Sequence, residues 1–379
     1  MRILVLIHEY PPVGGGGGRV AQDLCQGFVQ RGHEVRVLTA QCGDLPAQED
    51  QDGIQIIRLN SCRREPFRAD LRAMAGYVLT AVAKGLPLIR SWKPDVIHVH
   101  FAVPAGAAAW LLSLMTGVPY VLTAHLGDVP GGVPEKTGKW FRWIFPFTPP
   151  IWKRAARIAA VSEFTRSLAV RSYPVKVQVI PNGVNLQLLD PGEIKPNMPP
   201  QIVFAGRFMP QKNPLQIVRT LAALQDLPWT CALIGDGPLR AEVEQEIARH
   251  NLQDRFHLPG WLTPPQVIDW YRRSDILFMP SLSEGLPVVG VQALAMGLTL
   301  VLSRVGGNID LVQPGVNGNL LEPHDTQGFE SALRRWLSNP DELQKARLAS
   351  RQMAQQFDLH KIVDAYVLLL DEASGKDKA

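Results

Sequence analysis

Cysteine is scarce in this sequence, and metal-binding patterns are missing altogether. Only four cysteines occur among 379 residues, at positions 25, 42, 62 and 231, and no two of them have Cys-x-x-Cys spacing. We therefore expect free thiols, as in a protein that folds under reducing conditions, rather than a disulfide framework. No group of His, Cys, Asp and Glu residues has the spacing of a metal site either, so no metal cofactor is expected.

Long apolar runs are missing as well. No stretch of about 18 apolar residues occurs, and the apolar start at residues 3–7 is too short for a secretory leader and is soon followed by Glu9. No basic run or aromatic array is typical of nucleic-acid binding. We expect a cytoplasmic protein that has no membrane span and no nucleic-acid partner.

The overall charge of +4 hides an uneven distribution. Residues 1–190 hold 21 Lys and Arg against 14 Asp and Glu, whereas residues 191–379 hold 18 against 21. A basic first half suits an anionic acceptor or an acidic membrane surface, although a solvated basic face explains the same balance. Aromatic and basic residues alternate in residues 139–157, where we expect peripheral membrane contact; core packing with a basic rim fits nearly as well.

Short apolar segments alternate with helical periodicity along the whole chain, which predicts two successive α/β units with doubly wound parallel sheets. Residues 190–200 contain four prolines and interrupt the pattern. We therefore place a linker there, between domains at 1–190 and 200–356, and expect a cleft between the domains. An amphipathic helix at about 357–375 is expected to pack back on the first domain. The clearest expected strands are 3–7, 35–39, 95–100, 120–123, 157–161, 201–205, 231–234, 275–279 and 300–302.

One segment of the second half carries the most chemistry. Glu284 lies in a Glu-Gly-Leu-Pro turn directly before a short helix of small residues, and the N-terminus of a helix favours a phosphate. Gln292, eight residues further on, can face the same ligand. Arg207 and Lys212 follow the first strand of this half, and such a pair can neutralise a departing nucleoside diphosphate. The combination predicts a nucleotide-sugar site.

The first half offers a glycine run and a histidine at predicted strand ends, where ligands bind in open α/β sheets. Residues 14–18 are all glycine. A dinucleotide fingerprint fits poorly, because Arg19 takes the place of the third glycine and the second strand ends without an acidic residue. His125 follows a strand end and is expected in the cleft, a structural role being the alternative, and Asp128 can cap a turn.

With these motifs in this order and spacing, the chain resembles family 4 (GT4) of the retaining glycosyltransferases, which have the GT-B fold. The resemblance covers almost the whole chain and implies two Rossmann-like domains that face a central cleft. The residues that carry it are Gly15-Gly16, Asp95-Val-Ile-His-Val-His100, Thr123-Ala-His125, Ile180-Pro-Asn-Gly-Val184, Gly206-Arg207, Lys212, Gly235-Asp-Gly-Pro238 and the Glu284 segment up to Gly306-Gly307.

The resemblance implies a role for each matching residue. Arg207 and Lys212 would hold the donor diphosphate, and Glu284 would bind hydroxyls of the donor sugar. His125 would contact the donor hexose near the reacting centre. The remaining donor contacts would come from backbone at Gly15, Gly16, Gly285, Leu286, Pro287 and Val288, and from the side chain of Gln292.

The implied activity is a metal-independent, retaining transfer of a hexosyl group from a nucleotide-diphosphate sugar to a saccharide or lipid-linked acceptor, in polysaccharide or glycolipid synthesis. Gln292 departs from the family pattern, which usually has a second Glu there to bind the ribose. The lost charge is expected to lower donor affinity about tenfold. A nucleotide-sugar epimerase or hydrolase of the same fold, and a non-catalytic sugar-nucleotide-binding homologue, are the alternatives.

Overall fold

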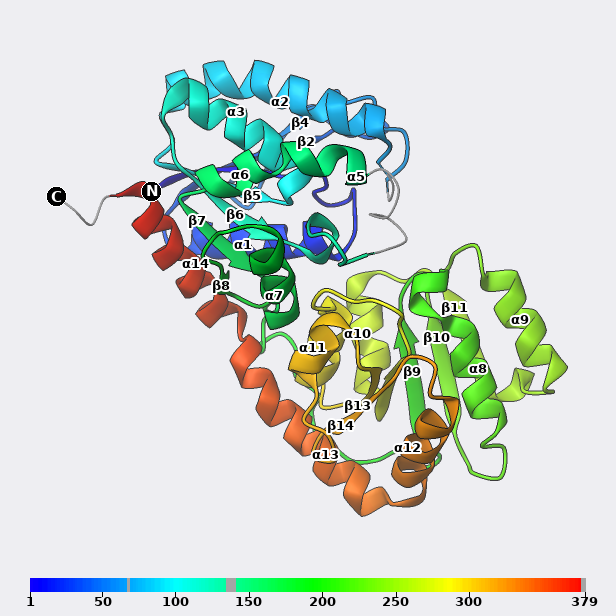
Figure 1. Cartoon of the computed structure of the whole chain (residues 1–379). Coiled ribbons are helices and arrows are strands. Elements are labelled where there is room, and N and C mark those ends of the chain that lie inside the picture. The colour runs from blue at the N-terminus through cyan, green and yellow to red at the C-terminus, as the bar shows by residue number, and fades with distance from the viewer. Residues whose placement is uncertain (67–68, 134–140, 376–379) are drawn as a thin grey trace. The chain divides into compact units, whose positions relative to one another are not determined.

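The computed structural model describes residues 1–66, 69–133 and 141–375. The chain divides into two compact units (Figure 1). Unit 1 comprises Met1–Asn182 together with Leu359–Ala379, and unit 2 comprises Gly183–Asp358. The chain therefore leaves unit 1 after Asn182 and returns to it at Leu359.

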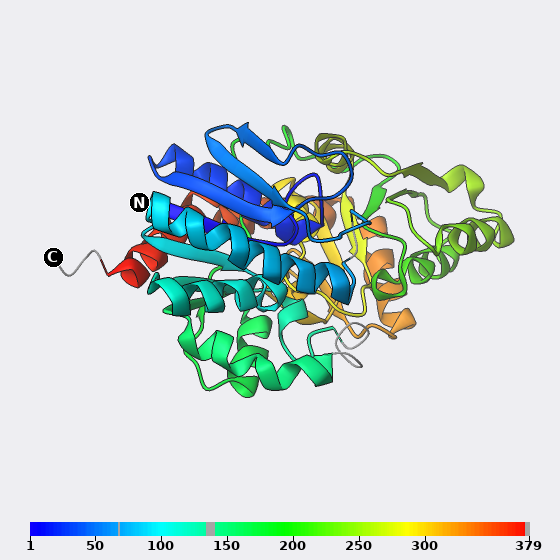
Figure 2. The ribbon, with the colours of Figure 1, turned by 90° about the horizontal axis from the view of Figure 1, so that it is seen from above.

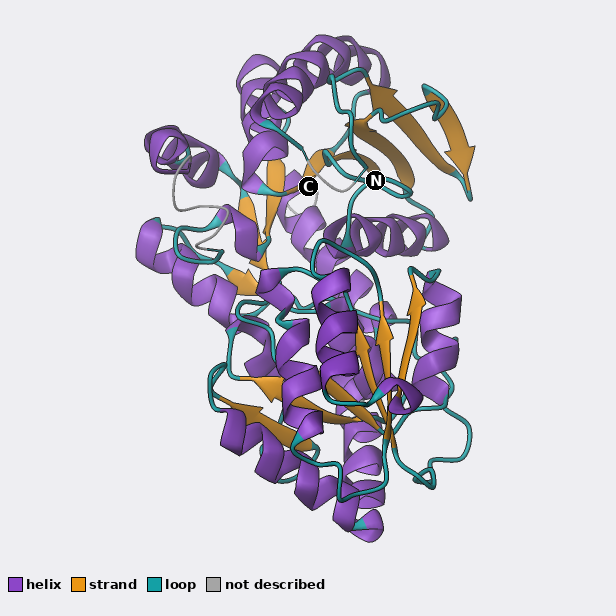
Figure 3. Ribbon diagram, turned by 90° about the vertical axis from the view of Figure 1, so that its right-hand side faces the viewer, coloured by secondary structure: helices purple, strands orange, loops and turns teal. Residues whose placement is uncertain are grey.

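Unit 1 contains a sheet with the strand order β3-β4-β2-β1-β5-β6-β7-β8. Its pairings are parallel except that of β3 with β4. The central strand β1 is buried from Ile3 to Leu6 because it has neighbours on both sides and helices over both faces (Figure 3). The strands are β1 (Arg2–Leu6), β2 (Glu34–Ala40), β3 (Gln48–Gln51), β4 (Ile54–Leu59), β5 (Val96–His100), β6 (Tyr120–Ala124), β7 (Arg157–Ala160) and β8 (Gln178–Val179).

The helices of unit 1 begin and end at recognisable signals. Asp70 caps the longest of them, α2, by accepting the backbone N–H of Ala73 at 2.8 Å, and α2 ends at Lys93 in the left-handed region. The helical segments are α1 (Gly16–Gln30), α2 (Leu71–Trp92), η1 (Ala102–Gly106), α3 (Ala107–Thr116), η2 (Leu126–Asp128), α5 (Phe141–Ile144), η3 (Phe145–Phe147), α6 (Pro149–Arg154), α7 (Glu163–Ser172) and α14 (Leu359–Ser374).

The C-terminal helix α14 belongs to unit 1 and contacts α1, β5, β6 and β7. Figure 2 shows it in red beside the blue N-terminal elements. Gly27 of α1 allows the close approach, since a Cβ at this position would lie 2.4 Å from a Val363 methyl carbon. Arg31 then pairs with Asp364 at 2.6 Å. Packing and charge together dock this amphipathic helix.

Unit 2 contains a parallel sheet with the strand order β11-β10-β9-β12-β13-β14. Thr263 and Gln266 form a capping box at the start of α10, with proline in the first turn, as their sequence spacing favours. The strands are β9 (Gln201–Ala205), β10 (Thr230–Ile234), β11 (Phe256–Gly260), β12 (Ile276–Met279), β13 (Thr299–Ser303) and β14 (Gly318–Leu321). The helical segments are η4 (Pro210–Lys212), α8 (Pro214–Ala222), α9 (Arg240–Arg249), η5 (Gln253–Arg255), α10 (Pro264–Arg272), α11 (Val288–Ala295), η6 (Gly306–Leu311), α12 (Thr326–Ser338), α13 (Pro340–Met353) and η7 (Ala354–Phe357).

Each sheet has a topological switch point, where successive connections leave in opposite directions. In unit 1 the switch lies between β1 and β5, and in unit 2 it lies between β9 and β12. The loops at the carboxyl ends of these strands diverge, which leaves room for a ligand. The predicted glycine run follows β1, and the predicted Arg207–Lys212 and Glu284 loops follow β9 and β12.

The segment predicted as a linker, residues 190–200, lies inside unit 2. Asp275, just before β12, is fully buried and accepts hydrogen bonds from the backbone N–H and side-chain amide of Asn197 at 3.1 and 2.9 Å. It also accepts the backbone N–H of Gln201 at 2.7 Å. The structure thus divides the units at Asn182–Gly183, before the predicted linker, and a buried carboxylate holds the proline-rich segment within unit 2.

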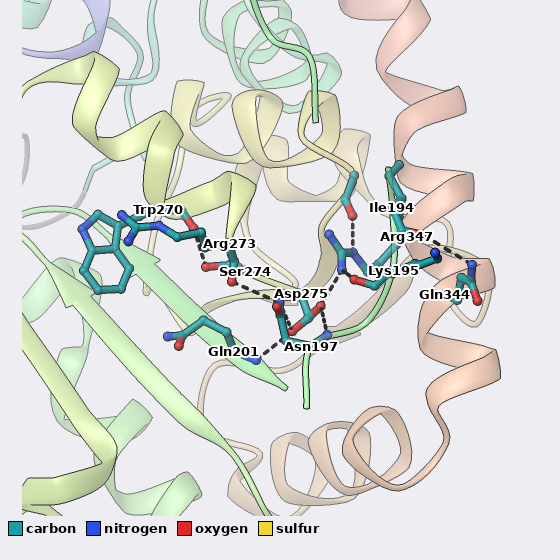
Figure 4. Close-up of polar contacts among 11 residues, drawn as sticks. Ile194, Lys195, Asn197, Gln201, Trp270, Arg273, Ser274, Asp275, Gln344 and Arg347 are labelled. Carbon is teal, nitrogen blue, oxygen red and sulfur yellow. Dashed lines mark hydrogen bonds and ion pairs between the residues drawn. The ribbon is translucent and has the colours of Figure 1, made fainter. Parts of the chain in front are cut away.

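Arg347 of α13 supplies the charge that balances Asp275. Its guanidinium pairs with the carboxylate at 2.5 Å and donates to the carbonyls of Lys195 and Gly297 at 2.7 and 2.8 Å (Figure 4). Burial lowers the pKa of Arg347, and Asp275 opposes that shift. We call these residues, with Asn197, the Asp275–Arg347 clamp. It joins the proline-rich segment, β12 and α13 into one body.

Candidate functional site

The switch point of unit 2 brings Lys212 and Glu284 into contact. Nζ of Lys212 lies 2.5 Å from Oε1 of Glu284, although 72 residues separate them in the sequence. Glu284 is only 5% exposed, and Lys212 is half-buried. The carboxylate would be costly to bury alone, so the ammonium is its necessary partner.

Backbone hydrogen bonds hold these two loops together independently of the charges. The N–H of Leu282 donates to the carbonyl of Gln211 at 2.7 Å, and the side-chain amide of Gln211 donates to the carbonyl of Ser283 at 2.9 Å. Both contacts involve the residues directly beside the ion pair. The geometry of the pair is thus built into the fold before any ligand arrives.

Two glycines, Gly306 and Gly307, pack directly against the backbone of the Glu284 loop. A Cβ on Gly306 would lie 1.6 Å from the carbonyl oxygen of Glu284, and one on Gly307 would lie 1.8 Å from that of Gly285. The N–H of Gly307 donates to the Glu284 carbonyl at 3.3 Å. No other residue type fits here, which explains why both glycines belong to the motif.

Arg207 leaves β9 on the same loop as Lys212. Its neighbour Phe208 is tied by a backbone hydrogen bond to Asp236 at 2.9 Å. Within the described part of the chain, the half-buried Arg207 side chain makes no hydrogen bond or ion pair. A fixed backbone that carries an unpaired guanidinium is suited to an anionic ligand.

Helix α11 begins at Val288, directly after Pro287; Gly290 donates its N–H to the Pro287 carbonyl at 2.9 Å, which leaves the N–H groups of Val288 and Val289 without a helical acceptor. Gln292 lies one turn into the helix and is half-buried. Because the helix starts four residues after Glu284, Gln292 lies closer to the N-terminus of the helix than it would if the helix began directly after Glu284. Arg351 and Arg347 donate to carbonyls at the other end of the helix, those of Ala295 and Gly297, where cations favour the helix dipole.

In unit 1, the glycine run lies against the loop after β1. Gly14 has φ +99°, and a Cβ there would lie 2.4 Å from the Cβ of Glu9. Gly15 is the N-cap of α1 and has open space around it, and Gly16 is the first residue of that helix. The run therefore lets the backbone approach Glu9 closely and leaves the start of α1 uncovered.

His125 follows β6 and is held on all sides. It is 8% exposed, its ring stacks on Phe101 with centroids 4.3 Å apart, and its Nε2 lies 3.3 Å from Nδ1 of His100. Burial lowers the pKa of His125 to about 4, so the ring is neutral at pH 7. The site has a neutral imidazole, not a cation.

Asp128 caps the turn that follows His125, as the sequence predicted. Its carboxylate accepts the backbone N–H groups of His125 and Ala102 at 2.8 and 2.9 Å, which ties the loops after β5 and β6 together. Burial raises the pKa of Asp128 to about 7, against the effect of these hydrogen bonds.

Three side chains at this edge were not among the predicted site residues. His98 and His100 are fully buried on β5, and Glu9 lies beside the glycine run. The i, i+2 spacing of the histidines was a usable signal, since it places both on one face of a strand. Glu9 could have been found as the acidic residue that ends the first apolar run.

The aromatic-basic segment at 139–157 divides into two parts, while Lys139 and Trp140 lie outside the described residues. Trp143 and Phe147 are exposed to 82% and 75%, whereas Trp152 is buried in the core of unit 1. Arg154 donates to the carbonyl of Ser113 at 3.0 Å. Core packing thus applies to Trp152, whereas membrane contact by the exposed aromatics stays a prediction.

Other absences predicted from the sequence concern thiols, metals and membranes. All four cysteines are free; Cys62 is exposed and the other three are buried. Over residues 1–66, 69–133 and 141–375, no group of three or more His, Cys, Asp or Glu side chains is placed to hold a metal ion. In the same ranges, none of the helices combines the length and apolar character needed to cross a bilayer.

Solved structures share the architecture of the whole chain. Sucrose-phosphate synthase from Thermosynechococcus elongatus superposes with a TM-score of 0.85 at 21% identity, over 97% of this chain and 98% of that one. HepE of Anabaena, solved in complex with UDP-glucose, superposes with a TM-score of 0.76 at 20% identity, over 98% and 99% of the two chains. These likenesses define the fold as GT-B, with two Rossmann-like domains.

The sequence comparisons agree. Residues 14–188 match the family model described as Glycosyltransferase Family 4, and residues 189–353 match the model described as Glycosyl transferases group 1. An uncharacterized glycosyltransferase of Methanocaldococcus jannaschii is 26% identical over 377 residues, which cover 99% of both chains. The chain belongs to glycosyltransferase family 4.

Proposed function

We propose that this glycosyltransferase moves a hexosyl group from a nucleotide-diphosphate sugar to a saccharide or lipid-linked acceptor, with retention of anomeric configuration and without a metal ion. The observation that carries the proposal is the Lys212–Glu284 pair at the switch point of unit 2. Arg207 lies on the same loop as Lys212, and α11 begins four residues after Glu284.

The cations suit a diphosphate leaving group. An ammonium has three N–H donors, so Lys212 can keep its contact with Glu284 while it donates to a phosphate oxygen. Arg207 can bind a second phosphate oxygen pair bidentately. As the sugar–phosphate bond breaks, negative charge grows on the departing diphosphate, and both cations stabilise it. In the proposal they take the place that a divalent cation holds in metal-dependent transferases.

Glu284 is assigned to the sugar. Its Oε1 is engaged by Lys212, and a carboxylate can accept further hydrogen bonds through its second oxygen. Hydroxyl groups of the hexose are natural donors to it. The backbone at Gly285, Leu286, Pro287 and Val288 is assigned to the sugar and phosphates.

Unit 1 is assigned to the acceptor and to additional donor contacts. A neutral His125 can hydrogen-bond a hydroxyl of the hexose, whereas a cation there would attract the phosphates instead. Gly15 and Gly16 offer backbone N–H groups at the open start of α1. Gln292 is assigned to the nucleotide ribose.

The test begins with thermal-shift screening of UDP-, GDP- and ADP-sugars, because a ligand that binds the native state raises the unfolding temperature. Transfer by the best donor is then followed by NMR of the product anomer, with and without EDTA. Glu284→Gln should lower kcat/KM by about 100-fold or more, while Glu342→Gln, on the surface of the same unit, should not. An inverted anomer, loss of activity in EDTA, or sugar release that needs no acceptor would each refute part of the proposal.

We also propose that Trp143 and Phe147 contact a membrane surface that carries the lipid-linked acceptor. Both side chains are largely exposed, and Lys153 lies exposed nearby in the sequence. Flotation with vesicles that contain anionic lipid should recover the parent protein, and the double variant Trp143→Ala/Phe147→Ala should bind several-fold less. Trp261→Ala, which removes an exposed tryptophan of unit 2, is the matched control. Equal flotation of the two variants would contradict the proposal.

A further inference from the structure

Two buried histidines form a cluster with His125 in unit 1. His98 and His100 are two residues apart on β5 and therefore lie on the same face of the strand. Both are inaccessible to solvent, and their ring centroids are 4.4 Å apart. Nδ1 of His100 lies 3.3 Å from Nε2 of His125. Neither His98 nor His100 has a role in the proposed donor site, yet one of them makes a direct contact with a residue of that site.

The hydrogen bonds assign the proton on the His125 ring. The backbone N–H of Asp128 donates to the His125 carbonyl at 3.0 Å and also to the His125 side chain, in a capping box. Only Nδ1 remains for the side-chain contact, because Nε2 faces His100. A neutral imidazole has a single proton, so the proton of His125 lies on Nε2.

The assignment for His100 follows from that of its neighbour. Nε2–H of His125 donates to Nδ1 of His100, so the proton of His100 lies on its own Nε2. That atom is buried without a partner among the described residues. Burial lowers the pKa of both rings, that of His125 to about 4, which keeps them neutral.

The other end of the cluster is separate. Nε2 of His98 lies 2.9 Å from the Thr123 hydroxyl, which in turn donates to the hydroxyl of Tyr366 on α14 at 3.4 Å. The Thr123 oxygen therefore accepts from His98. This second hydrogen-bond chain does not include His125.

We propose that His100 is a positioning residue for His125: by accepting the Nε2–H of His125, it holds the orientation of that ring and adds to the preference for the Nε2 tautomer that the Asp128 N–H sets. The inference rests on the proposed function, in which His125 contacts the donor sugar. The proton fixed on Nε2 can reach a sugar oxygen only if it is shared between that oxygen and Nδ1 of His100, since the ring has no other donor. It also prevents Nε2 from accepting a proton from the acceptor hydroxyl.

The test reads the tautomer directly. The full chain is labelled with ¹⁵N-histidine, long-range ¹H–¹⁵N correlations are recorded, and His125→Gln identifies the His125 signals. The parent should show protonated Nε2 and unprotonated Nδ1. His100→Phe keeps a ring but removes the acceptor, so the share of the Nε2 tautomer of His125 should fall, although the Asp128 N–H still favours it. His100→Asn retains an oxygen near the place of Nδ1 and should keep the parent pattern, as should the control Tyr366→Phe.

Activity supplies a second readout. Loss of one buried hydrogen bond should lower kcat about three- to tenfold in His100→Phe, with recovery in His100→Asn. A parent in which His125 is protonated on Nδ1 would overturn the inference, even if His100→Phe did not fold. An unchanged His125 pattern in a folded His100→Phe would also overturn it. If no donor is turned over while the tautomers behave as described, the proposed function fails and the role of His100 stands.

Discussion

The two units place different chemistry at the same point of similar sheets. Next to the switch point of unit 1, after β6, His125 is a buried neutral ring beside Asp128, whose pKa is raised to about 7. At the switch point of unit 2, Lys212 and Glu284 are paired at 2.5 Å. One edge offers neutral hydrogen-bonding groups, and the other offers groups that can carry full charge.

The difference follows from the cost of burying each kind of group and from the partners that offset this cost at each edge. A neutral ring can be buried with one or two hydrogen bonds, whereas a buried charge needs an opposite charge close by. A paired cation can still bind an anionic ligand, and a neutral imidazole is suited to hydrogen bonds with hydroxyl groups. This division supports the proposed assignment of the phosphates to the cations of unit 2, and of a sugar hydroxyl to the neutral His125 in addition to those assigned to Glu284.

The largest effect should come from breaking a buried charge pair. Asp275→Asn leaves the Arg347 guanidinium buried without its partner and should lower the free energy of unfolding of unit 2 by about 3–5 kcal/mol. In unit 1, Tyr366→Phe removes only a neutral hydrogen bond and should cost about 1 kcal/mol. Hydrogen–deuterium exchange of peptides from each unit, measured in a urea series, would give both values.

The exposed pair of Arg335 and Glu342 is the control for this experiment. Glu342→Gln should cost less than about 1 kcal/mol, because water screens that pair. The double variant Asp275→Asn/Arg347→Met should recover part of the stability that Asp275→Asn loses. Equal losses in Asp275→Asn and Tyr366→Phe would remove the distinction between charged and neutral burial.

Removal of the cation from unit 2 should come next. Lys212→Met leaves Glu284 buried alone and takes a charge from the diphosphate, so kcat/KM should fall by about 100-fold. Lys212→Arg should lose less, since it keeps the charge but changes its shape. Lys195→Met, which breaks an exposed pair with Glu193, serves as the control and should leave kcat/KM unchanged.

Acidification should weaken unit 1. The buried histidines bind protons below pH 6.5 when unfolded but not when folded, so the unfolded state takes up more protons and stability falls from about pH 6.5 towards pH 4. Buried carboxyls whose pKa values are raised act in the opposite direction over the same window, but they are fewer. The histidines are His8, His98, His100 and His125, and the carboxyls are Asp23 and Asp128.

The net loss should be roughly 1–2 kcal/mol per pH unit. Hydrogen exchange of unit 1 peptides, corrected for the intrinsic rate at each pH, measures it. The variant His98→Gln should reduce the slope. A stability of unit 1 that rises as the pH falls from 6.5 to 4 would contradict the assignment of buried neutral rings.

The smallest effect concerns Gln292. Gln292→Glu restores a charged acceptor one turn into α11 and should tighten nucleotide binding by up to about tenfold, as measured by calorimetry. Gln225→Glu adds the same charge elsewhere on unit 2 and should have no such effect. Weaker binding in Gln292→Glu would show that the added charge repels the diphosphate instead.

Much of the framework could be predicted from local sequence. The strand expected at residues 201–205 coincides with β9, and the loops expected to carry Arg207, Lys212 and Glu284 follow β9 and β12. Apolar runs and glycine-containing turns are local signals, so these elements were accessible. The direct pairing of Lys212 with Glu284 was not predicted, because it joins two loops 72 residues apart.

The rest depends on contacts between residues far apart in the chain. The end of unit 1 at Asn182 was missed because Asp275 holds Asn197 across 78 residues, and composition alone made the segment look free. The environment of His125 was missed for the same reason. Thr123, in the same buried cluster, meets Tyr366 243 residues later. Contacts between buried polar residues that are far apart in the chain leave little signal in the local sequence.

The Asp275–Arg347 clamp has a consequence for motion. Because it makes the proline-rich segment part of unit 2, that segment cannot serve as a flexible joint. Any rotation of one unit against the other must be absorbed by a few backbone torsions at the two crossings, near Asn182–Gly183 and Asp358–Leu359. Val184 is bridged to Asp358, so the two crossings are coupled and would swing as one pivot.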